Sequence, residues 1–372
     1  VVGAGEMGGD IAGWCALSGL HATLADLDPA AVAVAIGRAE AMFADRIHDP
    51  RERRAARDRL IPDFAGDGLC NADLVIEAIA EKAEAKRRLY ASIEGAMKPD
   101  APIATNTSSI PLSELREGLE RPGRVVGLHF FNPVKRMQLV EVVGDDASEE
   151  AALARARAFC GRIGKLPAPV ASAPGFLVNR ILTSGLLEAL ALLDEGAAPE
   201  TVDRAAEGFG MAMGPVAVAD QVGLDIALDV ADSLRAMLGG ALPEPPRWLR
   251  EKVEAGKLGK KTGEGLYRWK DGEPDKSETA PAPDDEMADR LILPMINAAA
   301  ACLREGVTDD PDVVDAAMIF GAGFAPFRGG PCRYAAARGI GELRAALERL
   351  RQAHGDRFAS DDGLDALAKA SA

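Results

Sequence analysis

The chain has 372 residues and a net charge of −15, with 48% hydrophobic and 27% charged residues. This balance is normal for a globular protein, and the acidic charge argues against partners such as nucleic acid or an anionic membrane surface. No apolar run approaches the roughly 20 residues of a membrane span. The five scattered cysteines form no CxxC pair and there are only four histidines, so we expect no disulfide framework, no metal site and a reducing, cytoplasmic location.

The first 168 residues alternate strand-like and helix-like segments. Strands are predicted over residues 1–2, 21–26, 72–79, 101–107, 125–131 and 138–144. Helices are predicted over residues 5–20, 29–60, 82–97 and 149–163. Strands separated by helices are typical of a parallel, doubly wound sheet, so we expect an α/β Rossmann-type domain over 1–168.

The remainder of the chain is predicted to be an all-α region. A Pro- and Ala-rich stretch, 166–175, predicts a breaker and a domain boundary. Apolar residues at helical period follow over 179–196, and the polar, Pro-rich stretch 269–286 predicts a linker or an exposed loop. We expect a first helical domain over 174–270 and a second over 284–372.

These two helical domains are related by an internal repeat. The segment RILTSGLLEALALLDEG starts at Arg180 and RLILPMINAAAACLREG starts at Arg290, and the two end in Gly196 and Gly306. Each is followed by a Val-Asp pair and then by a Gly-rich segment ending in Gly-Pro. Since each unit alone would expose an apolar face, the repeat predicts two related helical units that pack face to face.

Residues Gly3-Ala4-Gly5-Glu6-Met7-Gly8 form a GxGxxG motif between a strand end and a helix start. Its first Gly permits a tight turn, its second lets the backbone approach a pyrophosphate, and its third allows close helix–strand packing. Asp26 ends the second predicted strand, where an acid binds ribose hydroxyls and repels a 2′-phosphate. The pattern therefore favours NAD over NADP, and a purely structural Gly-rich turn is the alternative.

His129, in GLHFFNP, and Glu141, in LVEVVG, are candidates for acid–base chemistry. Oxidation of a hydroxyl to a ketone needs a base for the hydroxyl proton, and imidazole has a suitable pKa range, while a carboxylate can orient it. By residue type alone, a strand-end His is more often a hydrogen-bonded core residue, and Glu141 also fits a surface position. The residues alone leave both interpretations open.

Seven segments in chain order resemble the L-3-hydroxyacyl-CoA dehydrogenase family. They are GAGEMG, VIEAIAE, NTSSIPLSEL, GLHFFNP, LVEVV, APGFLVNRI and GKLGKKTGEGLYRW. The second repeat, with GFAPFRGG, is similar to the end of the multifunctional fatty-acid oxidation alpha subunits. The resemblance covers essentially the whole chain and implies NAD as cofactor and an acyl-CoA thioester as substrate.

Matching motifs then imply roles for individual residues. His129 corresponds to the family's base, Glu141 to its carboxylate partner, and Ser108 and Asn179 to groups that hydrogen-bond the reacting substrate oxygen. The predicted cofactor contacts are Gly3, Gly5, Glu6, Met7, Gly8, Asp26, Ile79, Ala80, Glu81, Lys86, Ser108, Asn132 and Lys261. By residue type alone, Ser108 also fits a helix N-cap, Asn179 a helix start and Lys86 a solvated helix face.

Two positions depart from the family pattern. Phe320 stands where the multifunctional subunits usually carry a substrate-linked Tyr, so this substrate-binding candidate lacks the hydroxyl. Asp289 stands where the first repeat has Asn179, so we expect the second repeat to be architectural, with no active site of its own.

The resemblance also implies partners. Multifunctional relatives carry an enoyl-CoA hydratase domain ahead of the dehydrogenase, and nothing in this chain resembles it. The abrupt start at Val1 leads us to expect a fused or missing hydratase domain, together with a thiolase subunit. Monofunctional relatives dimerise through their helical domain, and we expect the second helical unit to replace that dimer partner.

The sequence therefore predicts oxidation of (S)-3-hydroxyacyl-CoA to 3-oxoacyl-CoA with NAD in fatty-acid beta-oxidation. Two alternatives keep the same motifs. One is an NAD-dependent dehydrogenase of a 3-hydroxy acid without CoA, and the other is an NAD-binding structural protein that has lost the reaction.

Overall fold

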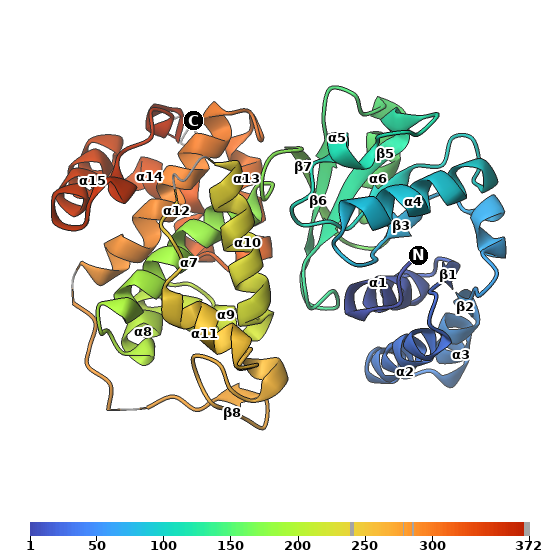
Figure 1. Cartoon of the computed structure of the whole chain (residues 1–372), viewed down its shortest axis with the longest axis horizontal. Coiled ribbons are helices and arrows are strands. Elements are labelled where there is room, and N and C mark those ends of the chain that lie inside the picture. The colour runs from blue at the N-terminus through green and yellow to red at the C-terminus, as the bar shows by residue number, and fades with distance from the viewer. Residues whose placement is uncertain (239–241, 278, 285, 368–372) are drawn as a thin grey trace. The chain divides into compact units, whose positions relative to one another are not determined.

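The computed structural model describes residues 1–238, 242–277, 279–284 and 286–367. The chain divides into two compact units, Val1–Ser172 and Ala173–Ala372, called here the first and second unit (Figure 1). Within the described ranges, no helix is long and apolar enough to cross a membrane.

The first unit is built on a mostly parallel sheet. Its strands are β1 (Ala22–Leu24), β2 (Leu60–Pro62), β3 (Val75–Glu77), β4 (Ile103–Thr105), β5 (Val125–Phe130), β6 (Leu139–Gly144) and β7 (Leu166–Ala171). Strands β1 and β2 pair in parallel, and β3 to β7 form a five-stranded sheet in sequence order. Val2 bridges Ala25 on one side and Glu77 on the other, both in parallel, and so joins the two pieces. The order is then β2-β1-Val2-β3-β4-β5-β6-β7.

The predicted Rossmann-type fold with a central parallel sheet is confirmed, except that one pair of strands, β5 and β6, is antiparallel. Strand β6 runs antiparallel to β5, and β7 pairs with β6 in parallel, so β6 and β7 point opposite to the others. The connection over 131–138 contains no helix. A parallel crossover needs a dozen or more residues, so this short connection allows only a direct reversal.

The interpretation of 166–175 as a breaker is also corrected, because Leu166–Ala171 forms β7. Pro167 and Pro169 are exposed, while Ala168 and Val170 between them are buried. Strand β7 lies at the sheet edge, where a proline can replace a residue whose N–H would not enter the ladder. The first unit ends directly after this strand, at Ser172.

Helices cover the sheet of the first unit (Figure 1). They are α1 (Glu6–Leu17), α2 (Pro29–Arg46), α3 (Pro50–Arg59), α4 (Ala83–Ile93), α5 (Leu112–Leu115) and α6 (Glu150–Arg162), with 3-10 turns η1 (Asp67–Asn71), η2 (Glu94–Ala96) and η3 (Pro122–Arg124). The single helix predicted over 29–60 is wrong, because it is broken after Arg46. The Asp49 carboxylate caps α3 by accepting from the Arg51 amide, and Pro50 takes the first helical position.

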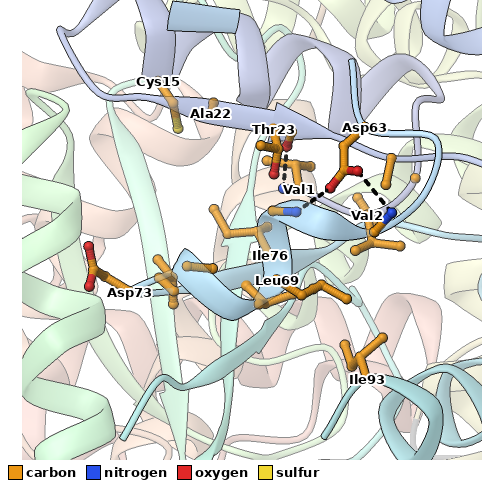
Figure 2. A pocket seen from close by; sticks show the side chains of 18 of the residues that line it. Val1, Val2, Cys15, Ala22, Thr23, Asp63, Leu69, Asp73, Ile76 and Ile93 are labelled. Atoms are coloured by element: carbon orange, nitrogen blue, oxygen red, sulfur yellow. Dashed lines mark hydrogen bonds between the residues drawn. The ribbon is translucent and has the colours of Figure 1, made fainter. Parts of the chain in front are cut away.

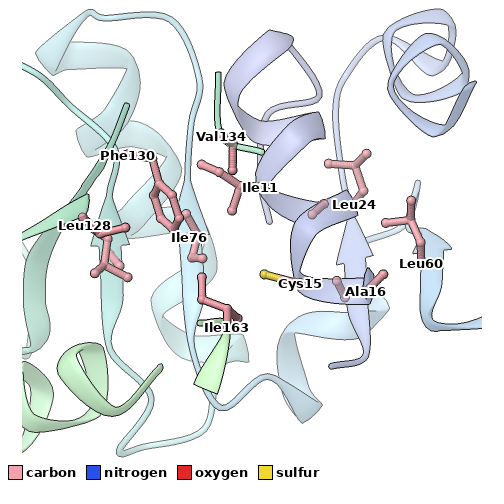
Figure 3. Close-up of a cluster of buried hydrophobic side chains, with 14 of the residues drawn as sticks. Ile11, Cys15, Ala16, Leu24, Leu60, Ile76, Leu128, Phe130, Val134 and Ile163 are labelled. Carbon is pink, nitrogen blue, oxygen red and sulfur yellow. The ribbon is translucent and has the colours of Figure 1, made fainter. Parts of the chain in front are cut away.

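The core of the first unit lies between α1 and the sheet. Ile11 and Cys15 of α1 meet Leu24, Ile76 and Phe130 of three different strands, and all five are buried (Figure 3). Burying each of the larger apolar side chains stabilises the fold by roughly 1.5–3 kcal/mol relative to its exposure. This packing fixes the start of α1 against the strand ends.

The second unit is helical, as predicted. Its elements are α7 (Val178–Asp194), α8 (Pro199–Phe209), α9 (Pro215–Val222), α10 (Leu224–Met237), α11 (Arg247–Glu254), η4 (Lys260–Thr262), β8 (Trp269–Lys270), β9 (Glu273–Pro274), α12 (Met287–Arg304), α13 (Pro311–Ala322), η5 (Pro326–Arg328), α14 (Pro331–Arg338), α15 (Ile340–His354), η6 (Asp356–Phe358) and α16 (Leu364–Leu367). The predicted linker 269–286 begins with the β8–β9 hairpin. Its residues 278 and 285, like 368–372 at the end of the predicted second domain, lie outside the described residues.

The sequence repeat is visible in the hydrogen bonds of the second unit. The Val216 amide at the start of α9 donates to Asp203 of α8 over 2.8 Å. The Cys332 amide at the start of α14 donates in the same way to Asp315 of α13 over 2.6 Å. The two Val-Asp pairs of the sequence therefore perform the same structural task in both repeats.

Helices α7 and α12, which begin the two repeats, pack against each other (Figure 1). Arg180 of α7 pairs with Glu305 at the end of α12 over 2.5 Å. Its counterpart Arg290 of α12 pairs with Glu195 at the end of α7 over 2.7 Å. These two ion pairs are reciprocal, as expected for an interface with approximate two-fold symmetry.

Candidate active site

The glycine-rich loop links Val2 to α1, and two of its glycines are required by packing. Gly3 has φ of +103°, and a Cβ there would clash with the carbonyl oxygen of Ala78. A Cβ on Gly8 would clash with the carbonyl oxygen of Gly3. A Cβ on Gly5, in contrast, would meet no atom within 4 Å. The backbone at Gly5 is therefore open to an approaching ligand at the N-terminus of α1, where amide groups favour phosphate.

Asp26 follows β1 and lies beside the glycine-rich loop. Its Oδ2 accepts a hydrogen bond of 2.6 Å from the Ala4 amide, and its Oδ1 accepts one of 3.0 Å from the Asp28 amide. These bonds hold the carboxylate next to the phosphate-binding turn. This arrangement fits the ribose hydroxyls of a dinucleotide and disfavours a 2′-phosphate.

A cavity of about 2020 Å³ runs along this part of the first unit (Figure 2). One part of its wall comes from the strand ends and includes Gly3, Gly5, Asp26, Ile79 and Ala80. This part contains the open backbone of Gly5, and it is where we place the dinucleotide cleft. Another part lies around Val1, whose amino group donates to the Thr23 carbonyl oxygen over 2.8 Å.

Glu81 and Lys86 belong to the segment that follows Ile79 and Ala80 of that wall. The side chain of Lys86 is 1% exposed and contacts Glu77 at 2.8 Å and Glu81 at 3.1 Å. The alternative that Lys86 belongs to a solvated helix face is therefore wrong. The Ser108 amide donates to Glu81 over 2.9 Å, so the cofactor candidate Glu81 also holds the Ser108 segment.

Two further cofactor candidates meet each other. The side-chain amide of Asn132 donates to the carboxylate of Glu6 over 2.9 Å, and both residues are exposed. Glu6 is the first residue of α1, so this bond connects the segment after β5 to the glycine-rich loop. Met7, its neighbour, instead packs partly buried against the core.

His129 and Glu141 form a buried pair. They lie directly opposite each other in the register of β5 and β6, and the distance from Nδ1 of His129 to Oε2 of Glu141 is 2.6 Å. His129 is 6% exposed and Glu141 is fully buried. The register of the antiparallel pair causes this contact, because residues directly opposite each other on adjacent strands point to the same face. A carboxylate at Nδ1 fixes the orientation of the ring and stabilises its cation.

Asn106 connects the Ser108 and His129 segments, and the sequence reasoning missed it. Its side-chain oxygen accepts a hydrogen bond of 2.8 Å from the Phe130 amide, next to His129. The backbone amide of Asn106 donates to the backbone carbonyl oxygen of Glu77. Asn106 directly follows β4, and a polar amide residue at a parallel strand end is the signal that could have identified it.

Asn179, Lys261 and Phe320 belong to the second unit, and their roles stay predictions. Asn179 lies half-buried in the first turn of α7, and Phe320 of α13 is 38% exposed. The Lys261 ammonium in η4 contacts both carboxylate oxygens of Asp225, at 2.6 and 2.7 Å. Asp289, the counterpart of Asn179 in the second repeat, is paired with Arg338.

No group of three or more His, Cys, Asp or Glu residues in the part of the chain that the structure describes could hold a metal ion. The candidate site consists instead of a glycine-rich loop with an acid beside it and a buried imidazole–carboxylate pair on β5 and β6. The loop and the acid beside it are typical of a nicotinamide-dinucleotide-binding domain.

The chain belongs to the 3-hydroxyacyl-CoA dehydrogenase family. Residues 1–173 match the family's NAD binding domain and residues 175–269 match its C-terminal domain. NAD is accordingly the cofactor of the first unit, and the glycine-rich loop and Asp26 fit it.

Relatives agree with this assignment. A fatty acid oxidation complex subunit alpha from Psychrobacter arcticus is 35% identical over 372 residues, covering 94% of this chain and 52% of that protein. The chain thus spans about half the length of the curated relatives it matches. A 3-hydroxybutyryl-CoA dehydrogenase structure from Escherichia coli is 27% identical with a TM-score of 0.86, covering 100% of this chain and 98% of that one. An (S)-3-hydroxybutyryl-CoA dehydrogenase structure from Ralstonia eutropha is 36% identical with a TM-score of 0.68, covering 72% and 97%.

Proposed function

We propose that the chain oxidises the 3-hydroxyl of an (S)-3-hydroxyacyl-CoA thioester to a ketone with NAD, as a step of fatty-acid beta-oxidation. The observation that carries the proposal is the buried His129–Glu141 pair, with 2.6 Å between Nδ1 and the carboxylate. A buried carboxylate on Nδ1 directs proton transfer to the other ring nitrogen, Nε2. Membership of the family supports the same reaction class.

The residues that would hold NAD are those of the glycine-rich loop together with Asp26. Gly5 offers open backbone, and the first turn of α1 offers amide groups for the pyrophosphate. Asp26 would accept hydrogen bonds from the adenosine ribose. Bound NAD supplies an acceptor for the hydride that leaves the substrate carbon.

His129 takes the hydroxyl proton at Nε2 during oxidation, and Glu141 stabilises the imidazolium that results. Ser108 donates a hydrogen bond to the substrate oxygen, which changes from hydroxyl to carbonyl. A neutral donor suits this oxygen because it serves both forms without a fixed opposite charge.

The test is the absorbance of NADH with purified protein and acetoacetyl-CoA, repeated with free acetoacetate. Loss of NADH with the thioester alone supports the proposal. Equal rates with both substrates favour a dehydrogenase that needs no CoA, an alternative suggested by the structural similarity to a diketoreductase at 28% identity and a TM-score of 0.62. No loss with either, from a protein that still binds NADH, favours a binding protein without the reaction.

We also propose that the second helical repeat, 284–372, takes the place of a dimer partner for the first, 174–270. The reciprocal ion pairs Arg180–Glu305 and Arg290–Glu195 support this, because a self-complementary interface contains each contact twice. The Asp289–Arg338 pair supports an architectural role for the second repeat. Light scattering of the isolated 372-residue chain, as distinct from the natural protein, should then give a mass near 39.0 kDa. Twice that mass would contradict the proposal.

Partners of the chain are a further proposal. The curated relatives are named as alpha subunits of a fatty acid oxidation complex, and the sequence predicts an enoyl-CoA hydratase domain and a thiolase subunit beside the dehydrogenase. Co-purification of the tagged natural protein with a thiolase from its own cells would test the thiolase prediction. The mass of the tagged natural protein would test the hydratase prediction. A tagged protein that purifies alone at 39.0 kDa would contradict them.

A further inference from the structure

A buried charged cluster lies at the end of β3. Glu77, the last residue of β3, is 0% exposed, and the Lys86 side chain from α4 is 1% exposed. The two are 2.8 Å apart. Burial of two charges is costly unless each is paired and fully hydrogen-bonded. The partners of this pair therefore indicate what the cluster does.

The Glu77 carboxylate connects three elements. Its Oε1 accepts from the Ile79 amide over 2.7 Å and from Lys86. Its Oε2 accepts from the hydroxyls of Tyr90 and Thr105 over 2.6 and 2.8 Å. The loop after β3, helix α4 and strand β4 are thus tied to one carboxylate.

Lys86 extends these connections to the Ser108 segment. Its ammonium also contacts Oε2 of Glu81 at 3.1 Å. The other oxygen of Glu81 accepts from the Thr107 hydroxyl and from the Ser108 amide. The Glu81 side chain is 40% exposed, so burial alone does not fix it, and its contacts with Lys86, Thr107 and Ser108 do.

We propose that Glu77 is a positioning residue for the dehydrogenase site, acting through Lys86 and Glu81. Its carboxylate holds the Ile79–Ala80 wall of the cofactor cleft directly and the Ser108 segment indirectly. The role given to Ser108 rests on the proposed function, whereas the role in cofactor binding does not. Glu77 itself touches neither cofactor nor substrate in this assignment.

Charge on Glu81 is needed for this arrangement, because an ionised carboxylate accepts from both Thr107 and Ser108. Burial raises the pKa of Glu81, but the nearby Lys86 ammonium and the Thr107 and Ser108 donors outweigh it and hold the pKa below its usual value. The charged groups around Glu81 are Lys86 from α4 and, beyond it, Glu77 from β3. Removing the Lys86 ammonium therefore raises the pKa of Glu81.

Tyr90 offers a matched control. Tyr90→Phe removes one hydrogen bond to Glu77 but leaves the Glu77–Lys86–Glu81 contacts in place. Glu77→Gln and Lys86→Met keep the approximate side-chain shape and remove a charge from that chain of contacts. A general loss of stability would affect all three variants, whereas a loss of positioning would affect only the last two.

The experiment compares these variants in melting temperature, NADH dissociation constant from fluorescence titration, and the pH profile of kcat/KM. Glu77→Gln and Lys86→Met should weaken NADH binding about tenfold and lower kcat by roughly 10- to 100-fold, because small misplacements near reacting groups are that costly. The acid limb of the Lys86→Met profile should move to higher pH. Tyr90→Phe should lower the melting temperature and keep NADH affinity and the pH profile of the wild type.

Wild-type NADH affinity in Glu77→Gln, or an equal loss of affinity in Tyr90→Phe at matched stability, would overturn the proposal. A second measurement serves if a variant is poorly stable. It is amide hydrogen exchange of residues 105–110 in the protein without cofactor, well below both melting temperatures. Exchange there should be faster in Glu77→Gln than in Tyr90→Phe. If the wild type oxidises no thioester, the proposed function fails, and the NADH titration still decides the role of Glu77.

Discussion

His129 of β5 and Glu141 of β6 lie directly opposite each other on antiparallel strands, with 2.6 Å between Nδ1 and the carboxylate. A pair in this register is fixed by the backbone of two strands rather than by loops. An imidazole held in this way loses little orientation when it takes up a proton. The pair is therefore the part of the site that mutation tests most directly.

Replacement of His129 by Gln should lower kcat by about 10²–10⁴-fold, because the base for the hydroxyl proton is lost. NADH binding, measured by fluorescence titration, should stay within twofold of the wild type, since the cofactor contacts lie on other residues. His48→Gln, at an exposed position, is the matched control. An unchanged turnover in His129→Gln would remove this residue from the mechanism.

Replacement of Asp26 by Ser should lower kcat/KM for NAD about 10- to 100-fold and raise activity with NADP, since the carboxylate no longer repels a 2′-phosphate. Initial rates with the two cofactors give the ratio. Asp28→Asn is the control, because it keeps the helix cap beside the cleft. A cofactor preference that does not change in Asp26→Ser would contradict the ribose contact.

Opposite effects on stability are expected for Ala substitutions of two glycines, Gly8 near the start of α1 and Gly37 within α2. Gly8→Ala should destabilise the first unit by about 3 kcal/mol, because its Cβ would clash with the Gly3 carbonyl oxygen. Gly37→Ala, at an exposed position within α2 with open space around the Cβ, should stabilise by about 0.5–1 kcal/mol. Urea unfolding measures both. Equal stability of Gly8→Ala and the wild type would show that the Gly3 carbonyl oxygen does not lie against Gly8 as described.

Much of the first unit could be predicted from sequence, because strand and helix periodicity, the GxGxxG spacing and Asp26 are local signals. The direction of β6 could not be predicted, because the apolar pattern of a strand is the same whether the strand runs parallel or antiparallel to its neighbour. Strand β7 was missed because Pro167 and Pro169 signal a break, and only its position at the edge makes them acceptable.

The candidate site shows the same division. His129 and Glu141 could be proposed from residue type and resemblance, whereas their contact depends on a register that no local pattern encodes. The buried state of Lys86 was hidden because α4 is rich in charges, and charged helix residues are usually solvated. Its partners Glu77 and Glu81 come from β3 and the following loop, so the cluster exists only after folding.

The buried Asp315 predicts a pH dependence of stability. Burial raises the pKa of its carboxyl to about 6, despite amide hydrogen bonds from Cys332 and Arg333. Because the folded state then binds the proton more tightly than the unfolded state, the contribution of Asp315 to stability is largest at low pH. It is lost as pH rises from about 4 to about 6, by up to about 2–3 kcal/mol. Asp315→Asn should flatten the unfolding free energy over this range, and an equal slope in both proteins would contradict the assignment.

The reciprocal ion pairs between α7 and α12 predict energetic coupling across the interface of the two repeats. Arg180 is nearly buried, with 7% of its side chain exposed, while Glu305 is 37% exposed. Solvent around Glu305 screens the attraction, so a double-mutant cycle of Arg180→Met and Glu305→Gln should give a coupling of only about 1–2 kcal/mol in urea unfolding. The corresponding cycle of Arg290→Met and Glu195→Gln should have the same sign. Arg290 also contacts the buried Glu188 at 2.5 Å, so only the coupling term of this cycle, and not the single-variant losses, is comparable. Arg349→Met, an exposed position on α15, should change stability by less than about 0.5 kcal/mol. A coupling energy in one cycle and none in the other would mean that the two ion pairs do not contribute alike to the interface. The proposed replacement of a symmetric dimer partner would then lose its main support.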